Sequence, residues 1–448
     1  MATLDASIVN IALPTLTREF DTEITRIKWV VISYLLSLIC LTLPFGRLSD
    51  YLGRRRVFIS GYVVFTLGSL LCGISPTLPA LLGARALQGV GASMLMSNGP
   101  AIITSAFPVG KRGAALGVLS MIVSLGLLSG PSLGGLLLAH ARWNVLFLIN
   151  IPIGLLGIFL AYRFIPSHTR PESLGPSFDW LGVGLQAALL LTFIAAVESP
   201  QIAFPGMGSL PIPRFVIGAV SFLLFIFLIR VELKAQSPIL DLSLFKIPLF
   251  RLANLASFFC FVSFSSAMIL MPFFLEGVLG LTSDQTGILL TANPIAVLVT
   301  APISGKLSDR IGSTGLSAVG ALLGTVAIAA LAGMFGAGLN ASISKTQILV
   351  ALACMGAATG IFQSPNNNSI MSAVPGEKLS SASALLATVR NMGMVTGTGV
   401  ATGLLAWRYE LTMDHIESFH YVLYVAALFG LGAFLSCLLK IKKNGLET

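Results

Sequence analysis

The sequence predicts an all-α polytopic membrane protein made of two similar halves, and three observations support this class. Of 448 residues, 55% are hydrophobic and only 10% are charged, too apolar for a water-soluble domain of this size. Uncharged runs such as 113–139, 252–275 and 418–439 exceed the roughly 20 residues that a membrane-spanning helix needs. A charged phrase between two such runs, Gly46-Arg47-Leu48-Ser49-Asp50, returns as Gly305-Lys306-Leu307-Ser308-Asp309.

The repeat extends beyond this phrase. Ala106-Phe107-Pro108 recurs as Ala373-Val374-Pro375, and Gly126 and Gly130 recur as Gly393 and Gly397. Halves related by parallel repetition are typical of membrane transporters. A β-barrel is not expected, because a barrel needs alternating segments of about 10 residues and these apolar runs are continuous.

The first half, residues 1–164, is predicted to be a six-helix bundle. Its first helix, about 1–16, spans only about 24 Å at 1.5 Å per residue, short of the roughly 30 Å hydrocarbon core. Either a misassigned start codon or a genuinely short helix explains this apparent truncation. The other expected helices cover about 29–45, 57–74, 78–106, 113–139 and 145–164, and the charged segment from Gly46 to Arg56 is expected to be a loop.

Residues 165–248 are predicted to form a linker with two additional transmembrane helices, about 178–197 and 215–231. The polar segments 166–177 and 232–248 around them are rich in Pro, Ser and charge, which is typical of boundaries. Residues 249–448 then form a second six-helix bundle and a tail with Lys440, Lys442 and Lys443. Its helices are expected at about 250–275, 286–305, 315–335, 346–373, 380–407 and 419–439, so the prediction is fourteen spans.

The net charge of +9 is better explained by membrane topology than by nucleic-acid binding. If the segment Arg54 to Arg56 is cytoplasmic, alternate loops hold 18 of the 27 Lys and Arg residues and the opposite loops hold 7. The positive-inside rule therefore predicts that both termini are cytoplasmic.

The repeated phrase is a candidate gate. Asp50 can cap the following helix and pair with Arg54 or Arg55, while Gly46 and Gly53 allow close backbone approach. With Asp309 in the second copy, such a charge network can hold one conformation closed and release it in another. The alternative is a turn that sets topology and has no dynamic role.

Ionisable residues inside apolar helices are candidates for function, because they are costly in a bilayer. Asp5 lies in helix 1 with Asn10, and Arg85 lies in helix 4 with Gln88. Our hypothesis is that Asp5 and Arg85 face a central cavity and that Asp5 exchanges protons. The alternatives are that Arg85 donates to backbone carbonyls and that Asp5 lies in headgroup water.

Two further groups are candidates for conformational change and substrate contact. In helix 5, small residues spaced at four can form a flat packing face, and a proline there can bend the span; ordinary membrane packing explains them equally well. In the second half, polar side chains at membrane depth either line a substrate cavity or satisfy one another across helices. The first group is Gly126, Gly130, Pro131, Gly134 and Gly135, and the second is Gln363, Asn366 and Arg390.

Other functional classes find no support. The four histidines and five cysteines lack metal-ligand spacing, so no metal is expected. There is no Gly-rich ATP-binding motif, and no nucleophile, base and orienting group recur at a recognisable spacing. We therefore expect neither an enzyme nor a cofactor, with the proton gradient as the energy source.

These residues resemble a known family, the fourteen-helix drug:proton antiporters of the major facilitator superfamily. The resemblance covers nearly the whole chain and implies the major facilitator fold, with alternating access by rocking of two bundles. It also implies an exporter of the inner or plasma membrane, driven by inward proton flow, with proton-coupling roles for Asp5 and Arg85. The matching segments are Leu4 to Pro14, Gly46 to Arg55, Arg85 to Gly91 and the helix 5 glycines with Pro131.

The predicted function is proton-coupled export of small lipophilic, drug-like compounds or metabolites, with protons and membrane lipids as the other partners. The helix at about 286–305 has no acidic residue, which argues against a preference for multivalent cations. The alternatives are a lipid flippase or dedicated metabolite exporter of the same fold, and a truncated, non-transporting paralogue. The sequence does not indicate an accessory subunit or an oligomeric state.

Overall fold

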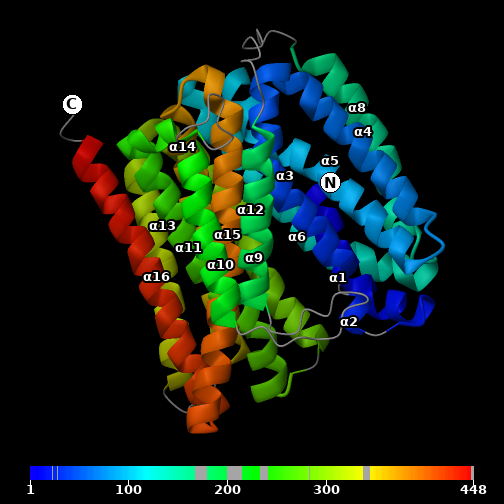
Figure 1. Cartoon of the computed structure of the whole chain (residues 1–448). Helices are drawn as coiled ribbons and strands as arrows, with labels where there is room; N and C mark the ends of the chain where they lie inside the picture. Colours follow the sequence, from blue (N-terminus) through cyan, green and yellow to red (C-terminus); the bar gives the residue numbers. More distant parts are fainter. Residues whose placement is uncertain are drawn as a thin grey trace.

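The computed structural model describes residues 1–22, 24–27, 29–166, 179–198, 214–232, 241–281, 283–336 and 344–444. Within these ranges the chain is helical and has no β-strand. Long helices run side by side, and the first half of the chain packs beside the second (Figure 1). The predicted all-α class is confirmed.

The first half begins with α1, which pairs with α6, while α5 packs between α3 and α4. Residue Ile149 separates α7 from α8, so the predicted helix 145–164 is two consecutive pieces. The helices are α1 (Ala2–Glu19), the short α2 (Ile24–Ile27), α3 (Trp29–Leu52), α4 (Arg54–Gly73), α5 (Leu78–Ala106), α6 (Arg112–His140), α7 (Val145–Leu148) and α8 (Asn150–Phe164).

Two helices, α9 (Trp180–Glu198) and α10 (Arg214–Glu232), lie between the halves in sequence. They pack against each other, and α9 also contacts α3 and α15, one helix from each half. Of the predicted polar segments beside them, residues 167–177 and 233–240 lie outside the described residues.

The second half consists of six long helices preceded by a 3₁₀ turn, Leu242–Lys246. The helix α11 continues directly into a π-helical turn, Phe274–Val278. The six are α11 (Pro248–Phe273), α12 (Ser283–Ile311), α13 (Ser313–Gly336), α14 (Lys345–Ser372), α15 (Leu379–Thr412) and α16 (His415–Asn444).

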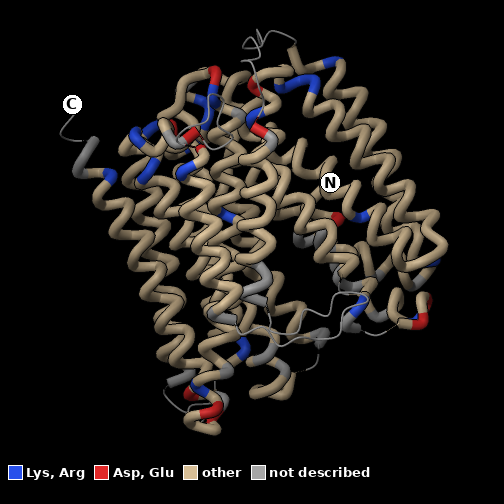
Figure 2. Tube along the Cα trace, viewed as in Figure 1, with Lys and Arg blue, Asp and Glu red and all other residues tan. Residues whose placement is uncertain are grey.

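The distribution of apolar residues fits a multi-pass membrane protein. In the described part of the chain, eight helical segments are long and apolar enough to cross a membrane: α3, α4, α7 with α8, α11, α12, α13, α14 and α16. Lys, Arg, Asp and Glu gather near the ends of the helices and are sparse along their middles (Figure 2). The total of fourteen spans stays a prediction.

The expected loop from Gly46 to Arg56 is wrong. The helix α3 continues through the charged phrase to Leu52, and only Gly53, at φ +92°, separates it from α4. The second copy behaves identically, because α12 continues to Ile311 and Gly312 also has φ +92°. Charged residues do not break a helix, whereas a positive φ favours glycine, so the single glycine sets each turn.

The prediction that Lys440 lies in the tail after the last helix is also wrong. The helix α16 continues to Asn444, and the Lys440 side chain is 1% exposed. Its Nζ donates to Ser317 Oγ at 3.2 Å, Asn366 Oδ1 at 3.3 Å and Ser369 Oγ at 3.2 Å. A buried ammonium needs such acceptors, and these neutral groups supply them inside the bundle.

The buried apolar cores show where the halves meet. At the end of the molecule that carries Asp50 and Asp309, which we call the motif end, one core combines Leu43 and Ala101 with Phe250 and Leu385. Toward the other end, one core belongs to the first half and another to the second. The two halves therefore share apolar packing at the motif end, and a further core of first-half residues also contacts Met392 of α15.

Candidate functional site

A buried ion pair lies inside the first half. Arg85 Nη1 of α5 is 2.5 Å from Asp5 Oδ2 of α1, and both side chains are 0% exposed. The two candidates therefore pair with each other, and in this conformation the bundle encloses them, so neither side chain is exposed to the expected central cavity. A buried charge is tolerated only with a partner and further hydrogen bonds, and each member has both.

The second carboxylate oxygen collects two more donors. Asp5 Oδ1 accepts from Gln88 Nε2 and from Asn150 Nδ2, each at 2.9 Å. Gln88 Nε2 also donates to Ser69 Oγ at 2.8 Å, and Gln88 Oε1 accepts from Arg85 Nη1 at 2.5 Å. The network therefore joins α1, α5 and α8 through the Asp5 carboxylate, and Gln88 extends it to α4.

The guanidinium is held by α3 as well. Arg85 Nε donates to the carbonyl of Val30 at 3.0 Å, and its Cζ lies 4.3 Å from the centroid of the Tyr34 ring. The Tyr34 hydroxyl donates in turn to the carbonyl of Ala2 at 3.1 Å. A cation above an aromatic ring is stabilised by the ring quadrupole, so Tyr34 supports Arg85 without a second carboxylate.

Sequence reasoning identified Asp5, Arg85 and Gln88 but missed Asn150, Ser69 and Tyr34. Asn150 was open to recognition, because it is the only polar side chain in the run from Val145 to Ala161. Ser69 and Tyr34 carry no comparable signal. Asn10, the other polar candidate of helix 1, lies in α1 and its side chain is outside the described residues.

Asp50 joins the halves at the motif end. Its Oδ2 accepts from the backbone nitrogen of Ser381 at 3.1 Å and from Ser381 Oγ at 2.6 Å, in the first turn of α15. Its Oδ1 lies 3.7 Å from Arg54 Nη2, and Arg54 also donates to the carbonyl of Gly376. We call this set the Asp50 contact.

The structure corrects the expected capping, and of the two alternative partners for Asp50 it shows Arg54. Gly53 is the N-cap of α4 and no side chain caps it, so Asp50 does not cap the following helix. Arg55 turns to α8 instead, where its Nη2 donates to the carbonyl of Tyr162 at 2.6 Å. Asp50 is used between the halves because the α15 N-terminus offers free backbone donors.

Asp309 makes the equivalent contact from the second half. Its Oδ1 and Oδ2 accept from the backbone nitrogens of Gly113 and Ala114, at 2.8 Å and 2.9 Å, in the first turn of α6. A carboxylate at a helix N-terminus is stabilised by the helix dipole and the free backbone donors. This Asp309 contact and the Asp50 contact are thus repeats of one arrangement on opposite halves.

The glycines of α6 allow close helix packing. A Cβ at Gly126 would lie 2.6 Å from Thr3 Oγ1 of α1, and one at Gly393 of α15 would lie 2.8 Å from the carbonyl of Phe258 in α11. Gly130 and Gly134 are also buried in α6. Pro131 and Gly135 belong to the same unbroken helix, but their side-chain surroundings lie outside the described residues. Gly46, the last of the glycine candidates, is buried in α3, where its carbonyl accepts from Ser49 Oγ.

Comparison with known proteins identifies the family. Residues 1–251 and 253–446 match the model of the Major Facilitator Superfamily. The chain belongs to this superfamily. It is 34% identical to the riboflavin transporter RibZ of Clostridioides difficile, over 95% of this chain and 90% of that protein. It is 32% identical to the multidrug resistance protein Stp of Mycobacterium tuberculosis, over 93% of this chain and 76% of that protein.

Solved structures agree with the major facilitator fold. The chain matches the human organic anion transporter MFSD10 with a TM-score of 0.66 and 16% identity, covering 97% of this chain and 96% of that one. It matches the proton:xylose symporter XylE with a TM-score of 0.68 and 15% identity, covering 97% and 93%. The predicted major facilitator fold and membership of the superfamily are confirmed.

The internal repeat of this major facilitator protein locates the counterpart of the ion pair. Gly89 approaches the carbonyl of Tyr34 just as Gly356 approaches that of Asn293. Counting along the helices from these glycines matches Arg85 with Leu352 and Gln88 with Met355. The packing of Gly126 and Gly393 likewise matches Asp5 with a residue near Ser263.

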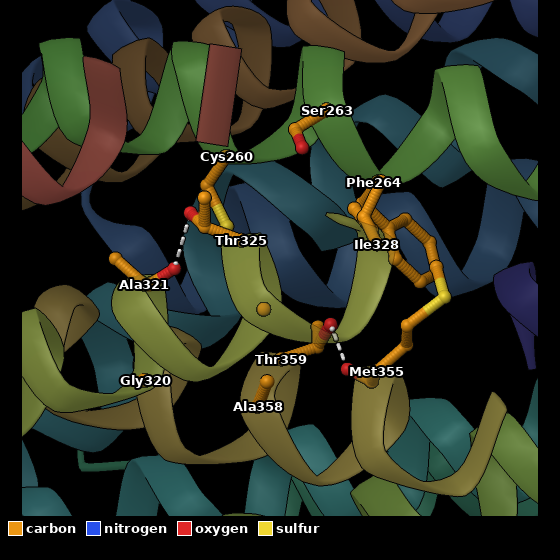
Figure 3. A pocket seen from close by; sticks show the side chains of 11 residues that line it. Cys260, Ser263, Phe264, Gly320, Ala321, Thr325, Ile328, Met355, Ala358 and Thr359 are labelled. Carbon is orange, nitrogen blue, oxygen red and sulfur yellow. Dashed lines mark hydrogen bonds between the residues drawn. The ribbon is translucent and has the colours of Figure 1, made fainter. Parts of the chain in front are cut away.

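The counterpart position is uncharged and contains a small cavity. Side chains of α11, α13 and α14 surround about 20 Å³ of free space, enough for roughly one water molecule (Figure 3). The hydroxyls of Thr325 and Thr359 donate to their own helices, while Ser263 Oγ has no partner among the described residues. The two halves therefore differ at this position: one is ionic and the other is mainly apolar.

The remaining candidates lie in α14 and α15. Asn366 is buried, and its Nδ2 donates to the carbonyl of Ala253 at 2.9 Å and to Ser257 Oγ at 2.8 Å. Together with Lys440 it connects helices within the second half in this conformation. Gln363 is half-buried in α14, and Arg390 is half-buried in α15, where its Cζ lies 5.9 Å from the centroid of the Phe261 ring.

Proposed function

We propose that this major facilitator transporter is a proton-coupled antiporter that exports small lipophilic compounds by alternating access. Membership of the superfamily makes it a multi-pass membrane transporter and not an enzyme. The observation that carries the proposal is the enclosed Asp5–Arg85 pair with donors on both carboxylate oxygens. An ionisable group in the membrane interior is a proton-relay candidate.

Protonation of Asp5 changes the forces on several helices at once. A neutral carboxyl group attracts Arg85 less strongly, and its protonated oxygen accepts fewer hydrogen bonds. Gln88 and Asn150 then have less reason to hold α5 and α8 against α1. We therefore propose that proton binding loosens this junction and that substrate binding favours proton release.

The Asp50 and Asp309 contacts supply the conformational part of the proposal. Each contact bonds one half to a helix N-terminus of the other. Because several charge-assisted bonds must break together, the contacts favour two discrete arrangements over gradual opening. The positive-inside pattern supports a cytoplasmic motif end, cytoplasmic termini and location in the inner or plasma membrane.

The proposal is tested with purified protein in liposomes under an imposed pH gradient. Riboflavin, the cationic dye rhodamine 123 and the anionic dye fluorescein serve as probes, and the movement of probe and protons is recorded. Wild-type protein is expected to move at least one probe against its gradient. Asp5→Asn is expected to lose gradient-driven accumulation while still exchanging probe down a concentration gradient.

Asp414→Asn is the matched control, because Asp414 is an exposed aspartate that caps α16 through the backbone nitrogen of Ile416. This variant should transport like the wild type, since asparagine is also a good N-cap residue. Full gradient-driven accumulation by Asp5→Asn would disprove the coupling role.

A second candidate is a transporter dedicated to one metabolite, and the 34% identity to a riboflavin transporter favours it. The two candidates differ in competition. A dedicated transporter should move riboflavin and remain unaffected by excess rhodamine 123 or fluorescein. An exporter of many compounds should show mutual inhibition among the probes.

A further inference from the structure

Arg390 lies deep in the second half. It follows the start of α15, Leu379, by eleven residues, which corresponds to roughly 16 Å along a helix. Half of the hydrocarbon core is about 15 Å, so Arg390 lies near the middle of the membrane. Two residues further on, Met392 packs against an apolar core that is formed mainly by first-half residues, Tyr34 and Leu38 among them. This stretch of α15 therefore lies where the two halves meet.

Arg390 has no acidic partner among the described residues. The ion pairs in this part of the chain are Arg54–Asp50, Arg85–Asp5, Lys378–Asp241 and Arg408–Glu417. The contact that Arg390 does make is with the face of Phe261, at 5.9 Å. An unpaired guanidinium at this depth is costly, and such residues mark substrate or ion pathways.

Hydrogen-bonding capacity near Arg390 is also unused. Asn391 Nδ2 and Thr388 Oγ1 are buried and have no partner among the described residues. The amide nitrogen can only donate, and the hydroxyl can donate. These two side chains lie three residues apart on one face of α15, whereas Arg390 projects from a different face. The guanidinium itself is therefore the group that suits a ligand that accepts hydrogen bonds and carries negative charge.

A cationic ligand would find fewer binding partners than an anion in this region. The Asp5 carboxylate is enclosed and already accepts from Arg85, Gln88 and Asn150. The equivalent position of the second half holds a serine, not an acid. The described helices therefore place a positive charge, Arg390, deep in the second half and offer no available carboxylate there that could pair with a cationic ligand.

We propose that the substrate is a planar aromatic anion and that Arg390 binds its carboxylate or sulfonate. Phe261 offers an aromatic surface beside the guanidinium, which donates the hydrogen bonds to the anionic group. The inference deepens the proposed function, because it names the charge class of the compound that the antiporter carries.

Equilibrium binding to protein in nanodiscs tests this without a proton gradient. The probes are fluorescein and rhodamine 123, two xanthene dyes of similar shape and opposite charge, followed by fluorescence anisotropy. Wild-type protein should bind fluorescein about tenfold or more tightly than rhodamine 123, since a charge-assisted hydrogen bond contributes at least that factor. Arg390→Gln should lose this preference, and Arg390→Lys should retain most of it.

Arg408→Gln is the matched control, because Arg408 lies on the same helix and pairs with the exposed Glu417. It should bind fluorescein like the wild type. The inference would be overturned if both glutamine variants lost fluorescein affinity equally, or if Arg390→Gln kept the wild-type affinity. It would also be overturned if the wild type bound rhodamine 123 more tightly than fluorescein, or bound neither dye.

The binding result is separable from proton coupling. Arg390-dependent fluorescein binding together with full gradient-driven transport by Asp5→Asn would preserve the anion site and reject the coupling proposal. Loss of gradient-driven transport in Asp5→Asn, together with fluorescein binding that does not depend on Arg390, would support the coupling proposal and reject the anion site.

Discussion

Arg85 is the side chain on which the polar contacts of the first half converge. It bonds to a carboxylate, an amide oxygen and a backbone carbonyl from different helices and also lies over Tyr34. Replacing a whole buried pair by apolar residues can be harmless, whereas removing one partner leaves a buried charge uncompensated. The cost of losing Arg85 therefore depends on whether Asp5 is still charged.

Arg85→Ala is expected to lower stability by about 3–5 kcal/mol, the usual cost of breaking a buried pair. Arg85→Lys should cost less, although an ammonium cannot reproduce the planar set of guanidinium donors. Thermal unfolding in detergent measures the difference. The double variant Asp5→Asn with Arg85→Ala should recover part of the loss, and an Arg85→Ala protein as stable as the wild type would contradict the argument.

Prediction of individual residues from the sequence succeeded where a side chain is of an unusual type for its surroundings. Asp5 and Arg85 were recognised because ionisable residues are rare in apolar helices. The partner of Asp50 was not, because Ser381 is an ordinary serine 331 positions away in sequence. Its role depends on how the two halves pack, and nothing local to either residue encodes that.

At the scale of the helices and turns, an ion pair connects the segments that precede α15 and α11. Lys378 Nζ lies 2.7 Å from Asp241 Oδ2, joining the turn before α15 to the 3₁₀ turn before α11. Burial alone would raise the pKa of the Asp241 carboxyl. Hydrogen bonds from Lys378 and Ser243 outweigh it, so the pKa lies below its ordinary value of 3.8.

This shift predicts a pH-dependent contribution to stability. A carboxyl group whose pKa is lowered by folding stabilises the folded state above its unfolded pKa, and the contribution disappears as pH falls through the folded pKa. Wild-type protein should therefore exceed Asp241→Asn in melting temperature at pH 7 and 5, and the gap should close below about pH 4. A gap that widens on acidification would show that another group is responsible.

Helices were predicted well in their apolar parts and poorly at their ends. The expected helix at 78–106 coincides with α5, whereas α3, α12 and α16 run past the expected boundaries into charged residues. Hydropathy locates the part of a helix that lies in lipid. It cannot locate the end, which depends on a glycine with positive φ or on partners such as those that keep Lys440 inside the bundle.

At the scale of the whole molecule, the halves meet most closely through α6 and α12. A Cβ on Gly113 would lie 2.5 Å from the carbonyl of Gly305 and 2.6 Å from Asp309 Oδ1. Neither the backbone nor the bonded carboxylate can move without disturbing the Asp309 contact. This single glycine therefore limits how near the two bundles can come at the motif end.

Gly113→Ala is expected to move the halves apart at this end. The stability of the helix α6 itself should not decrease, because alanine has a higher helix propensity than glycine. Spin labels on cysteines at the exposed positions Arg56 and Lys306, in a variant without native cysteines, report the separation by electron–electron resonance. The distance distribution should shift to larger values.

Gly315→Ala provides the comparison, since Gly315 also lies in the first turn of a helix but has nothing within 4 Å of an added Cβ. It should leave the distances unchanged. Identical distributions in both alanine variants would mean that the Gly113 contact does not hold the halves together.

The first half holds the Asp5–Arg85 pair, whereas the equivalent position of the second half is uncharged. This difference bears on how large a substrate concentration gradient the transporter can maintain. If the network carries the proton, each passage through it moves one proton, because the second half has no carboxylate in the matching place. A pH difference of one unit then supports about a tenfold concentration ratio of a neutral substrate, and 100 mV adds about 2.3 kcal/mol, roughly fiftyfold. For an anion leaving as the proton enters, both movements carry positive charge inward, so the membrane voltage acts twice.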